Sequence, residues 1–324
     1  MEVVVLSHAE VTELLPYDEC IELMAQALVD LTEGRIWHPL RSVVRPPDEP
    51  SLMGLMAAHR SAPAKDYAIK VVCIFPGNRA RGLDSHFGTV TLYDGETGKP
   101  LAVADAAAIT AIRTAAVSAV ATRALAREDA AELAVLGAGV QARAHLLALA
   151  TVRPFSAARV WGRTEAKAHE LVDGLELPFP VEVVASAREA VEGADVVTTT
   201  TASPEPIVSR EWLAPGAHVN AVGSSIATAR EIDAATMAEA ALFADRRESF
   251  FAEAGDYLLA VAEIGEREVR AELGEVVTGA GEGRRDAKEL TLFKSLGLAA
   301  EDLAVVEHLY RRATETGAGQ RAEL

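Results

Sequence analysis

The chain has 324 residues, half of them hydrophobic, so it is long enough for two domains with full cores, and disorder is excluded as its main state. Its 48 acidic and 31 basic residues give a net charge of −17, which opposes binding to nucleic acid or anionic lipid. We therefore expect a small-molecule ligand. The two cysteines, Cys20 and Cys73, provide neither a disulfide framework nor a thiol metal site, and we expect two buried, reduced thiols.

The N-terminal segment MEVVVLSHAEVTELL carries acidic residues where a secretory signal needs a basic start and a clean apolar stretch. The longest uncharged run, residues 212–229, contains Pro215, Gly216, His218 and Asn220, which do not suit a membrane span. We expect a cytoplasmic protein.

The first third of the chain has the pattern of a mixed α+β domain. A helix is predicted near 18–33, and short strands are predicted at 67–75 and 88–94, separated by the turn sequences FPGN and DGETG. The alanine-rich stretch 105–127 predicts one long helix, and we place a domain boundary along it.

After residue 130 the pattern changes to apolar strands alternating with helical stretches. Six strands are predicted in this region: ELAVLG, ARVWGR, VEVVA, DVVTTTT, HVNAVG and EAALFAD. Such alternation indicates an α/β fold with a doubly wound parallel sheet. The tail, residues 301–315, predicts a further amphipathic helix.

A glycine-rich turn follows the first of these strands. Gly137, Gly139 and Ala142 form a G-x-G-x-x-A pattern between the strand and the next helix. The first glycine permits the tight turn, the second lets a pyrophosphate approach the backbone, and the helix N-terminus faces the anion. The alternative is an ordinary strand-to-helix connection. In this context we predict a dinucleotide site made by Gly137, Ala138, Gly139, Val140 and Gln141.

The end of the second strand indicates which dinucleotide binds. An NAD site would place an acidic residue there for the ribose hydroxyls, whereas this chain has Arg163 followed by Thr164. A guanidinium pairs well with a 2′-phosphate, and the threonine hydroxyl adds a donor. We therefore expect NADPH to be preferred, with NAD(H) possible. In the alternative interpretation Arg163 is a solvated surface residue and Glu165 is the acid.

Several separated motifs make the chain resemble the ornithine cyclodeaminase/mu-crystallin family over nearly its whole length. These motifs are KVVCIFPGN, SHFGTVTLYDGETGKPLA, ITAIRTAAVSAVAT, VLGAGVQA, GADVVTTTTA, PGAHVNAVGSS, EAGD and TLFKSLG. The resemblance implies a substrate-binding and dimerisation domain at 1–117 plus 302–324. It also implies an inserted NAD(P)-binding Rossmann domain at 118–301 and a homodimer.

The resemblance also implies a substrate site. Arg41, Lys70 and Arg113 match the positions at which family members hold the substrate carboxylate. Three converging cations would attract a small anion to a protein that is otherwise acidic, and a guanidinium suits a carboxylate bidentately. Each of the three could otherwise be a surface cation.

Further family positions surround the nicotinamide end of the cofactor: Ser85, His86, Val222, Gly223 and Ser295. His86 could donate to a cofactor amide or phosphate, or it could be structural. Thr199 and Thr201 end the fourth strand, at the edge of the sheet where such folds bind ligands, although threonine is also simply a good strand former.

Two departures from the family bear on the reaction. Ornithine cyclodeaminases resemble one another in carrying two acidic residues near the substrate amines, at positions occupied here by Gly54 and Ser225. Managing proton transfers on a diamine needs carboxylates. Both are missing, which argues against a cyclodeaminase.

The combined pattern predicts an NAD(P)H-dependent reductase of a cyclic imine carboxylate, 1-pyrroline-2-carboxylate or 1-piperideine-2-carboxylate, that yields a cyclic L-amino acid. Lys70, Ser225 and Glu253 are candidates for the proton donor, and Arg113 would fix the substrate against the cofactor. Three alternatives remain: an amino-acid dehydrogenase of alanine or opine type, an ornithine cyclodeaminase, and a non-catalytic binding protein like the mu-crystallins.

Overall fold

The computed structural model describes residues 2–323, apart from the side chain of Arg79. The chain forms two compact units. Unit 1 comprises the chain up to Arg113 together with the segment from Leu298 onward, and unit 2 is Thr114–Gly297. The boundaries predicted from the sequence were 117/118 and 301/302, whereas the structure divides the chain at 113/114, within a helix, and at 297/298, just before one.

Unit 1 is built on an eight-stranded sheet with the order β16-β1-β7-β6-β5-β4-β2, and β3 also pairs with β4. The β1–β7 pair is parallel and the other pairs are antiparallel. The strands are β1 (Glu2–Leu6), β2 (Ile36–Trp37), β3 (Ser42–Val44), β4 (Leu52–Arg60), β5 (Asp66–Ile74), β6 (His86–Asp94), β7 (Pro100–Asp105) and β16 (Gln320–Glu323). The helices are α1 (His8–Leu14), α2 (Tyr17–Thr32), the 3-10 helix η1 (Pro76–Arg81) and α12 (Ala299–Thr316).

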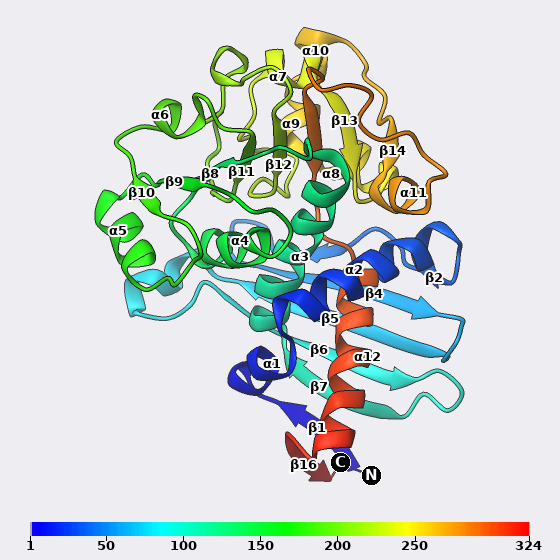
Figure 1. Ribbon diagram of the computed structural model, residues 1–324. Helices are drawn as coiled ribbons and strands as arrows, with labels where there is room; N and C mark the ends of the chain where they lie inside the picture. The colour runs from blue at the N-terminus through cyan, green and yellow to red at the C-terminus, as the bar shows by residue number, and fades with distance from the viewer. Residues whose placement is uncertain (1, 324) are drawn as a thin grey trace. The chain divides into compact units, whose positions relative to one another are not determined.

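Alternation along the central strands gives this sheet two different faces. Met56, Lys70 and Val90 lie side by side in register and are buried on the face that α12 crosses (Figure 1). The opposite face exposes large apolar side chains, including Met53 and Phe87, which share one row of the sheet with Cys73. Cys20 is buried as predicted, but Cys73 is only half-buried, because it lies on this second face.

The long helix α3 (Ala106–Leu125) confirms the helix predicted from the alanine-rich stretch. It is long and apolar enough to cross a membrane, but 83% of the apolar stretch is buried inside the protein. That burial is typical of a core helix.

Unit 2 contains an eight-stranded parallel sheet with the order β10-β9-β8-β11-β12-β15-β13-β14, which confirms the predicted doubly wound α/β class. Its strands are β8 (Glu132–Leu136), β9 (Ala157–Trp161), β10 (Val181–Val183), β11 (Val196–Thr199), β12 (His218–Ala221), β13 (Ala241–Ala244), β14 (Ala271–Glu272) and β15 (Thr291–Lys294). Its helices are α4 (Val140–Ala150), α5 (Glu165–Asp173), α6 (Ala187–Val191), η2 (Arg210–Trp212), α7 (Ala234–Glu239), α8 (Arg247–Glu253), α9 (Gly255–Leu258), α10 (Val261–Ile264) and α11 (Leu273–Thr278).

Two strands of this sheet were not among the six predicted. β14 is only two residues long, and β15 enters between β12 and β13 although it follows both in the chain. Along the chain, β14 and β15 continue the alternation of strands and helices, with α11 between them.

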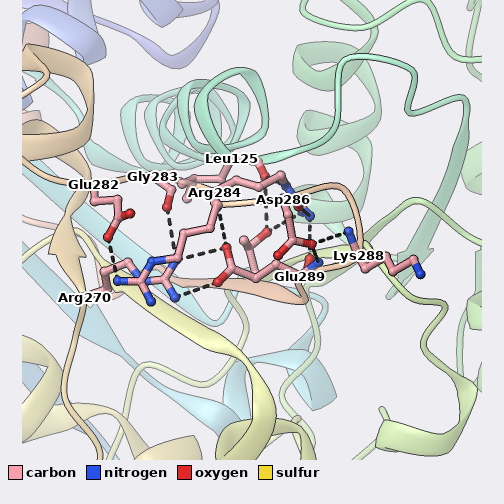
Figure 2. Close-up of polar contacts among 10 residues, drawn as sticks. Leu125, Arg270, Glu282, Gly283, Arg284, Asp286, Lys288 and Glu289 are labelled. Carbon is pink, nitrogen blue, oxygen red and sulfur yellow. Dashed lines mark hydrogen bonds and ion pairs between the residues drawn. The ribbon is translucent and has the colours of Figure 1, made fainter.

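The amino-terminal edge of this sheet is closed by polar contacts (Figure 2). Arg284 donates to the carbonyl oxygens of Leu125 (2.6 Å) and Ala217 (3.2 Å) and to the hydroxyl of Thr291 (2.8 Å). His218, which begins β12, is fully buried against the same hydroxyl at 2.9 Å, and burial lowers its pKa to about 3, so it is neutral. These contacts fix the strands at their amino-terminal ends. Parallel sheets bind ligands at the opposite edge, which is formed by the carboxyl ends of the strands.

Candidate active site

The glycine turn after β8 has the geometry of an anion cradle. Gly137 has φ +135°, and a Cβ there would lie 2.3 Å from the Thr200 hydroxyl oxygen, so only glycine fits. Gly139 is the N-cap of α4, and a Cβ on it would have no atom within 4 Å. The first turn of α4 carries no acidic residue, and its Val140 is 71% exposed. The turn therefore presents open backbone and a helix N-terminus, as a pyrophosphate site requires.

The predicted specificity residues lie close to this turn. A Cβ on Gly162 would come within 2.8 Å of the Ala138 side chain, so the ends of β8 and β9 pack tightly together. Arg163 and Thr164 follow and are exposed, and Thr164 is the N-cap of α5 without using its side chain as a cap. Glu165, the acid of the alternative interpretation, faces His169 at 3.7 Å along α5.

The hydroxyls of Thr199 and Thr201 do not point into open space at the carboxyl edge. Both donate to the buried carboxylate of Glu231, at 2.7 and 2.6 Å. Sequence reasoning missed Glu231, which stands 32 residues beyond Thr199 and 30 beyond Thr201 without any recognisable motif around it.

In unit 1, two of the three predicted carboxylate-binding cations share one anion. The Lys70 ammonium lies 2.7 Å from Oδ2 of Asp302, and the Arg113 guanidinium lies 3.2 Å from Oδ1 of the same carboxylate. Arg113 also donates to Glu301 at 2.8 Å. All four side chains are at most 5% exposed, so Arg113 is not a helix-surface arginine.

This arrangement changes the electrostatics expected from the sequence. The expected excess of positive charge around Lys70 and Arg113 is offset by the carboxylates of Glu301 and Asp302. Burial lowers the pKa of Lys70 to about 8, while the charge of Asp302 opposes that shift. The site therefore offers a preorganised pair of cations without a net charge of its own.

Glu301 and Asp302 were missed by the sequence analysis. They occupy the first turn of α12, where acidic residues are favoured by the helix dipole alone and so attract no attention. One signal was available in the sequence. The two acids interrupt an otherwise apolar run, LGLAAEDLAVV, which is typical of a buried segment and not of a solvent-exposed one.

The remaining predicted residues are placed individually within their units. Arg41 is half-buried just before β3, and His86 is exposed at the start of β6 with its ring 2.9 Å from the half-buried Ser85. In unit 2, three further residues follow the carboxyl ends of strands: Val222 and Gly223 after β12, and the buried Ser295 after β15. Ser225 and Glu253 are half-buried, in the loop after β12 and at the end of α8.

Gly54 lies on the same sheet face as Lys70. It is buried in β4 opposite Val72, and a Cβ at this position would already be 3.3 Å from the Val72 side chain. The site therefore lacks a carboxylate at position 54, and a larger side chain would displace its neighbour.

Comparison with known proteins extends these observations. The sequence model of the ornithine cyclodeaminase/mu-crystallin family matches residues 1–317. The chain is 41% identical to the ketimine reductase mu-crystallin of Rattus norvegicus over 278 residues, 86% of each chain. It is 35% identical to a delta(1)-pyrroline-2-carboxylate reductase of Bacillus cereus over 98% of this chain and 99% of that one.

Solved structures of related enzymes are also similar to this chain over nearly its whole length. The structure of Thermococcus litoralis delta(1)-pyrroline-2-carboxylate reductase in complex with NADH and L-proline superposes with a TM-score of 0.94 at 35% identity, covering 98% of this chain and 99% of that one. An archaeal alanine dehydrogenase dimer with bound NAD superposes with a TM-score of 0.92 at 30% identity, covering both chains completely.

Proposed function

Because this chain belongs to the ornithine cyclodeaminase/mu-crystallin family, we propose that it reduces the C=N bond of a cyclic imine carboxylate to a cyclic L-amino acid. It is an NAD(P)H-dependent oxidoreductase, and the substrates we propose are 1-pyrroline-2-carboxylate and 1-piperideine-2-carboxylate. The observation that carries the proposal is the buried Lys70–Asp302–Arg113 cluster, which holds two cations ready for a carboxylate.

The residues of the glycine turn fit a nicotinamide dinucleotide, whose reduced form supplies the hydride when bound. Open space above Gly139 and the N-terminus of α4 would take the pyrophosphate. The exposed Arg163 and Thr164 at the end of β9 would take a 2′-phosphate, and on this basis we propose that NADPH is preferred.

Substrate orientation falls to Lys70 and Arg113. Arg113 offers a planar fork that matches a carboxylate bidentately, and Asp302 restrains both cations before any substrate arrives. A carboxylate fixed in this way places the adjacent C=N carbon in a defined orientation, and such positioning can supply a large part of the rate enhancement.

The charge balance of the cluster favours a substrate that is itself neutral overall. Two cations face two carboxylates, so a net anion would add an uncompensated buried charge. A cyclic imine carboxylate with a protonated nitrogen carries one positive and one negative charge. Hydride addition to its C=N carbon leaves a neutral ring amine, which takes up one further proton to give the zwitterionic amino acid. Protonation also makes the C=N carbon a better hydride acceptor.

Among the three candidates for the proton donor, we propose Lys70 as the group that supplies the proton taken up by the ring nitrogen. Its pKa of about 8 lets it hold a proton at neutral pH and release it at little cost. Ser225 and Glu253 are only half-buried, in the loop after β12 and at the end of α8.

The uncovered face of the unit 1 sheet supports a homodimer as part of the proposal. Met53, Tyr67 and Phe87, on neighbouring strands, are 39–51% exposed on the face opposite α12. An apolar sheet face of this kind marks a protein-protein contact. Phe87→Glu should convert the dimer to a monomer in sedimentation experiments, and a chain that is already monomeric would contradict this part.

The catalytic proposal is tested by following NADPH and NADH oxidation with each cyclic imine and, separately, with pyruvate and ammonia. The proposal expects turnover with the cyclic imines and a much lower kcat/KM with the open-chain pair. Efficient turnover of pyruvate with ammonia alone would identify an alanine-type dehydrogenase instead. Cofactor binding without turnover of any substrate would indicate a binding protein.

A further inference from the structure

Glu231 is a fully buried acid at the carboxyl edge of the unit 2 sheet, outside the residues assigned above to cofactor or substrate. One carboxylate oxygen accepts from the Thr201 amide and hydroxyl, both at 2.6 Å. The other accepts from the Thr199 hydroxyl at 2.7 Å and the Gly223 amide at 2.8 Å. Four donors therefore converge on this single side chain.

Those donors belong to the turns that carry the candidate cofactor residues. Thr199 and Thr201 flank the turn after β11, and Gly223 begins the turn after β12. The Thr200 hydroxyl between the two threonines donates to the Leu136 carbonyl at 3.1 Å, and this threonine fills the space beside Gly137. Glu231 thus joins the turns after β11 and β12 directly and reaches the glycine turn through Thr200.

A second buried pair holds Glu231 itself. Asp256 accepts from the backbone amides of Glu231 and Ile232 at 2.7 and 3.0 Å, and its other oxygen lies 2.8 Å from the Lys294 ammonium. Both members of this ion pair are completely buried. Lys294 ends β15, so the acid is anchored to another strand at the same edge of the sheet.

The backbone around this carboxylate is closely packed. A Cβ on Gly223 would lie 2.1 Å from the Thr201 carbonyl oxygen and 2.5 Å from Oε1 of Glu231. A Cβ on Gly255 would lie 2.0 Å from the carbonyl oxygen of Ala229, in the loop that leads to Glu231. Any change in the position of Glu231 must therefore move the turns that it contacts.

The hydrogen bonds also favour a carboxylate at this position, since those from Thr201 and Thr199 oppose the burial that raises the pKa of Glu231. Each carboxylate oxygen accepts from one backbone amide, that of Thr201 or that of Gly223, and an amide side chain can accept from only one of the two. A glutamine in this position would turn its NH₂ group toward one of these backbone amides and leave that amide without an acceptor, while the neighbouring threonine hydroxyl can rotate to accept.

We propose that Glu231 is a positioning residue for the nicotinamide cofactor, one that sets the turns after β8, β11 and β12 in their binding arrangement. The inference rests on the proposed placement of the cofactor at these turns. In this proposal Glu231 acts through the backbone of Gly223 and Thr201 and through Thr200, not by contact with the reacting atoms.

The test compares Glu231→Gln with Glu289→Gln as a matched control. Glu289 is a partly buried carboxylate of the same unit, paired with Arg270 at 2.6 Å at the opposite edge of the sheet (Figure 2). NADPH and NADH affinities are measured by fluorescence titration without substrate, alongside the thermal midpoint. Glu231→Gln should weaken the binding of both cofactors by about tenfold or more, since a backbone amide left without its acceptor disturbs the shared part of the site. Glu289→Gln should leave both affinities unchanged.

Two further measurements separate positioning from general destabilisation. The KM for the cofactor should rise in Glu231→Gln, while kcat at saturating cofactor stays within about threefold of the unmodified enzyme. If Glu231→Gln does not fold, Thr199→Val and Thr201→Val take its place in the test. Each removes one hydroxyl donor but retains the acid, so each should give a smaller loss of cofactor affinity. Unchanged affinity in the two threonine variants, or in folded Glu231→Gln, overturns the inference. Absence of cofactor binding by the unmodified protein overturns the proposed function as well.

Discussion

Asp302→Asn is the substitution that probes the substrate site most deeply, because one carboxylate restrains both proposed substrate-binding cations. Its oxygens lie 2.7 Å from the Lys70 ammonium and 3.2 Å from the Arg113 guanidinium. A hydrogen bond to a charged group contributes about 1.5–3 kcal/mol. If that restraint supports substrate binding in the transition state, kcat/KM for the imine should fall by about 10- to 100-fold.

The same substitution should change the pH dependence. The Asp302 charge supports the protonated form of Lys70, so its removal lowers the pKa of Lys70 below about 8. The decline of kcat/KM at alkaline pH, which follows loss of the Lys70 proton, should therefore begin at lower pH in the variant. An ionisation of the substrate itself would act equally on both proteins.

The effect on stability has a definite sign. The folded-state pKa of Lys70, about 8, is below its ordinary value of 10.5. The difference corresponds to about 3 kcal/mol in the free energy of unfolding. Stability associated with this group is therefore present above pH 10.5 and is lost as pH falls through about 8. Asp302→Asn increases that loss, so the variant should be less stable than the unmodified protein at pH 7, and the difference should narrow as the pH is raised.

The assay is steady-state NADPH oxidation over a range of pH, with thermal unfolding measured in the same buffers. Glu307→Gln is the matched control, because this carboxylate lies on the same helix, α12, but pairs with Arg60 at 2.9 Å. It should retain the kcat/KM and pH profile of the unmodified enzyme. A folded Asp302→Asn enzyme with unchanged kcat/KM and an unshifted alkaline limb would refute the role assigned to Asp302.

Three further outcomes are expected. Arg113→Lys keeps the charge but loses the planar fork, so kcat/KM for the imine should fall at least about tenfold with little change in NADPH affinity, and Arg113→Ala should be worse; near-normal kcat/KM in Arg113→Ala would remove the carboxylate clamp. Arg163→Ala should weaken NADPH binding by about 10- to 100-fold and leave NADH binding nearly unchanged; a preference of the unmodified enzyme for NADH would show that the NADPH proposal is wrong. Gly137→Ala places a Cβ 2.3 Å from the Thr200 hydroxyl oxygen at φ +135°, so cofactor affinity and thermal midpoint should both fall, and their constancy in titration and melting experiments would contradict the geometry of the turn.

Local patterns predicted much of the fold. The alanine-rich run became α3, and the glycine turn formed at the β8–α4 junction, since both depend on short-range propensity and backbone geometry. The place of β15 between β12 and β13 was not predicted, because the order of strands in a sheet is decided by tertiary packing and not by neighbours in the chain.

The candidate site was predicted only in part, for a related reason. Lys70 and Arg113 stand within recognisable motifs, whereas their partners Glu301 and Asp302 begin a helix nearly 190 residues beyond Arg113. Acids in a first helical turn are common, so their pairing shows only when the chain is folded. Glu231 was hidden in the same way, because its four donors come from turns that meet only in the assembled sheet.

The central claim is tested most directly by identifying the product formed from 1-pyrroline-2-carboxylate and NADPH with the purified enzyme, using chiral chromatography. The account predicts that L-proline appears in equal amount to the NADPH oxidised, and that Arg113→Ala abolishes its formation while still binding the cofactor. Absence of proline would contradict a site in which Lys70 and Arg113 orient the imine carboxylate for hydride transfer. Racemic proline formed by Arg113→Ala at the rate of the unmodified enzyme would contradict it as well.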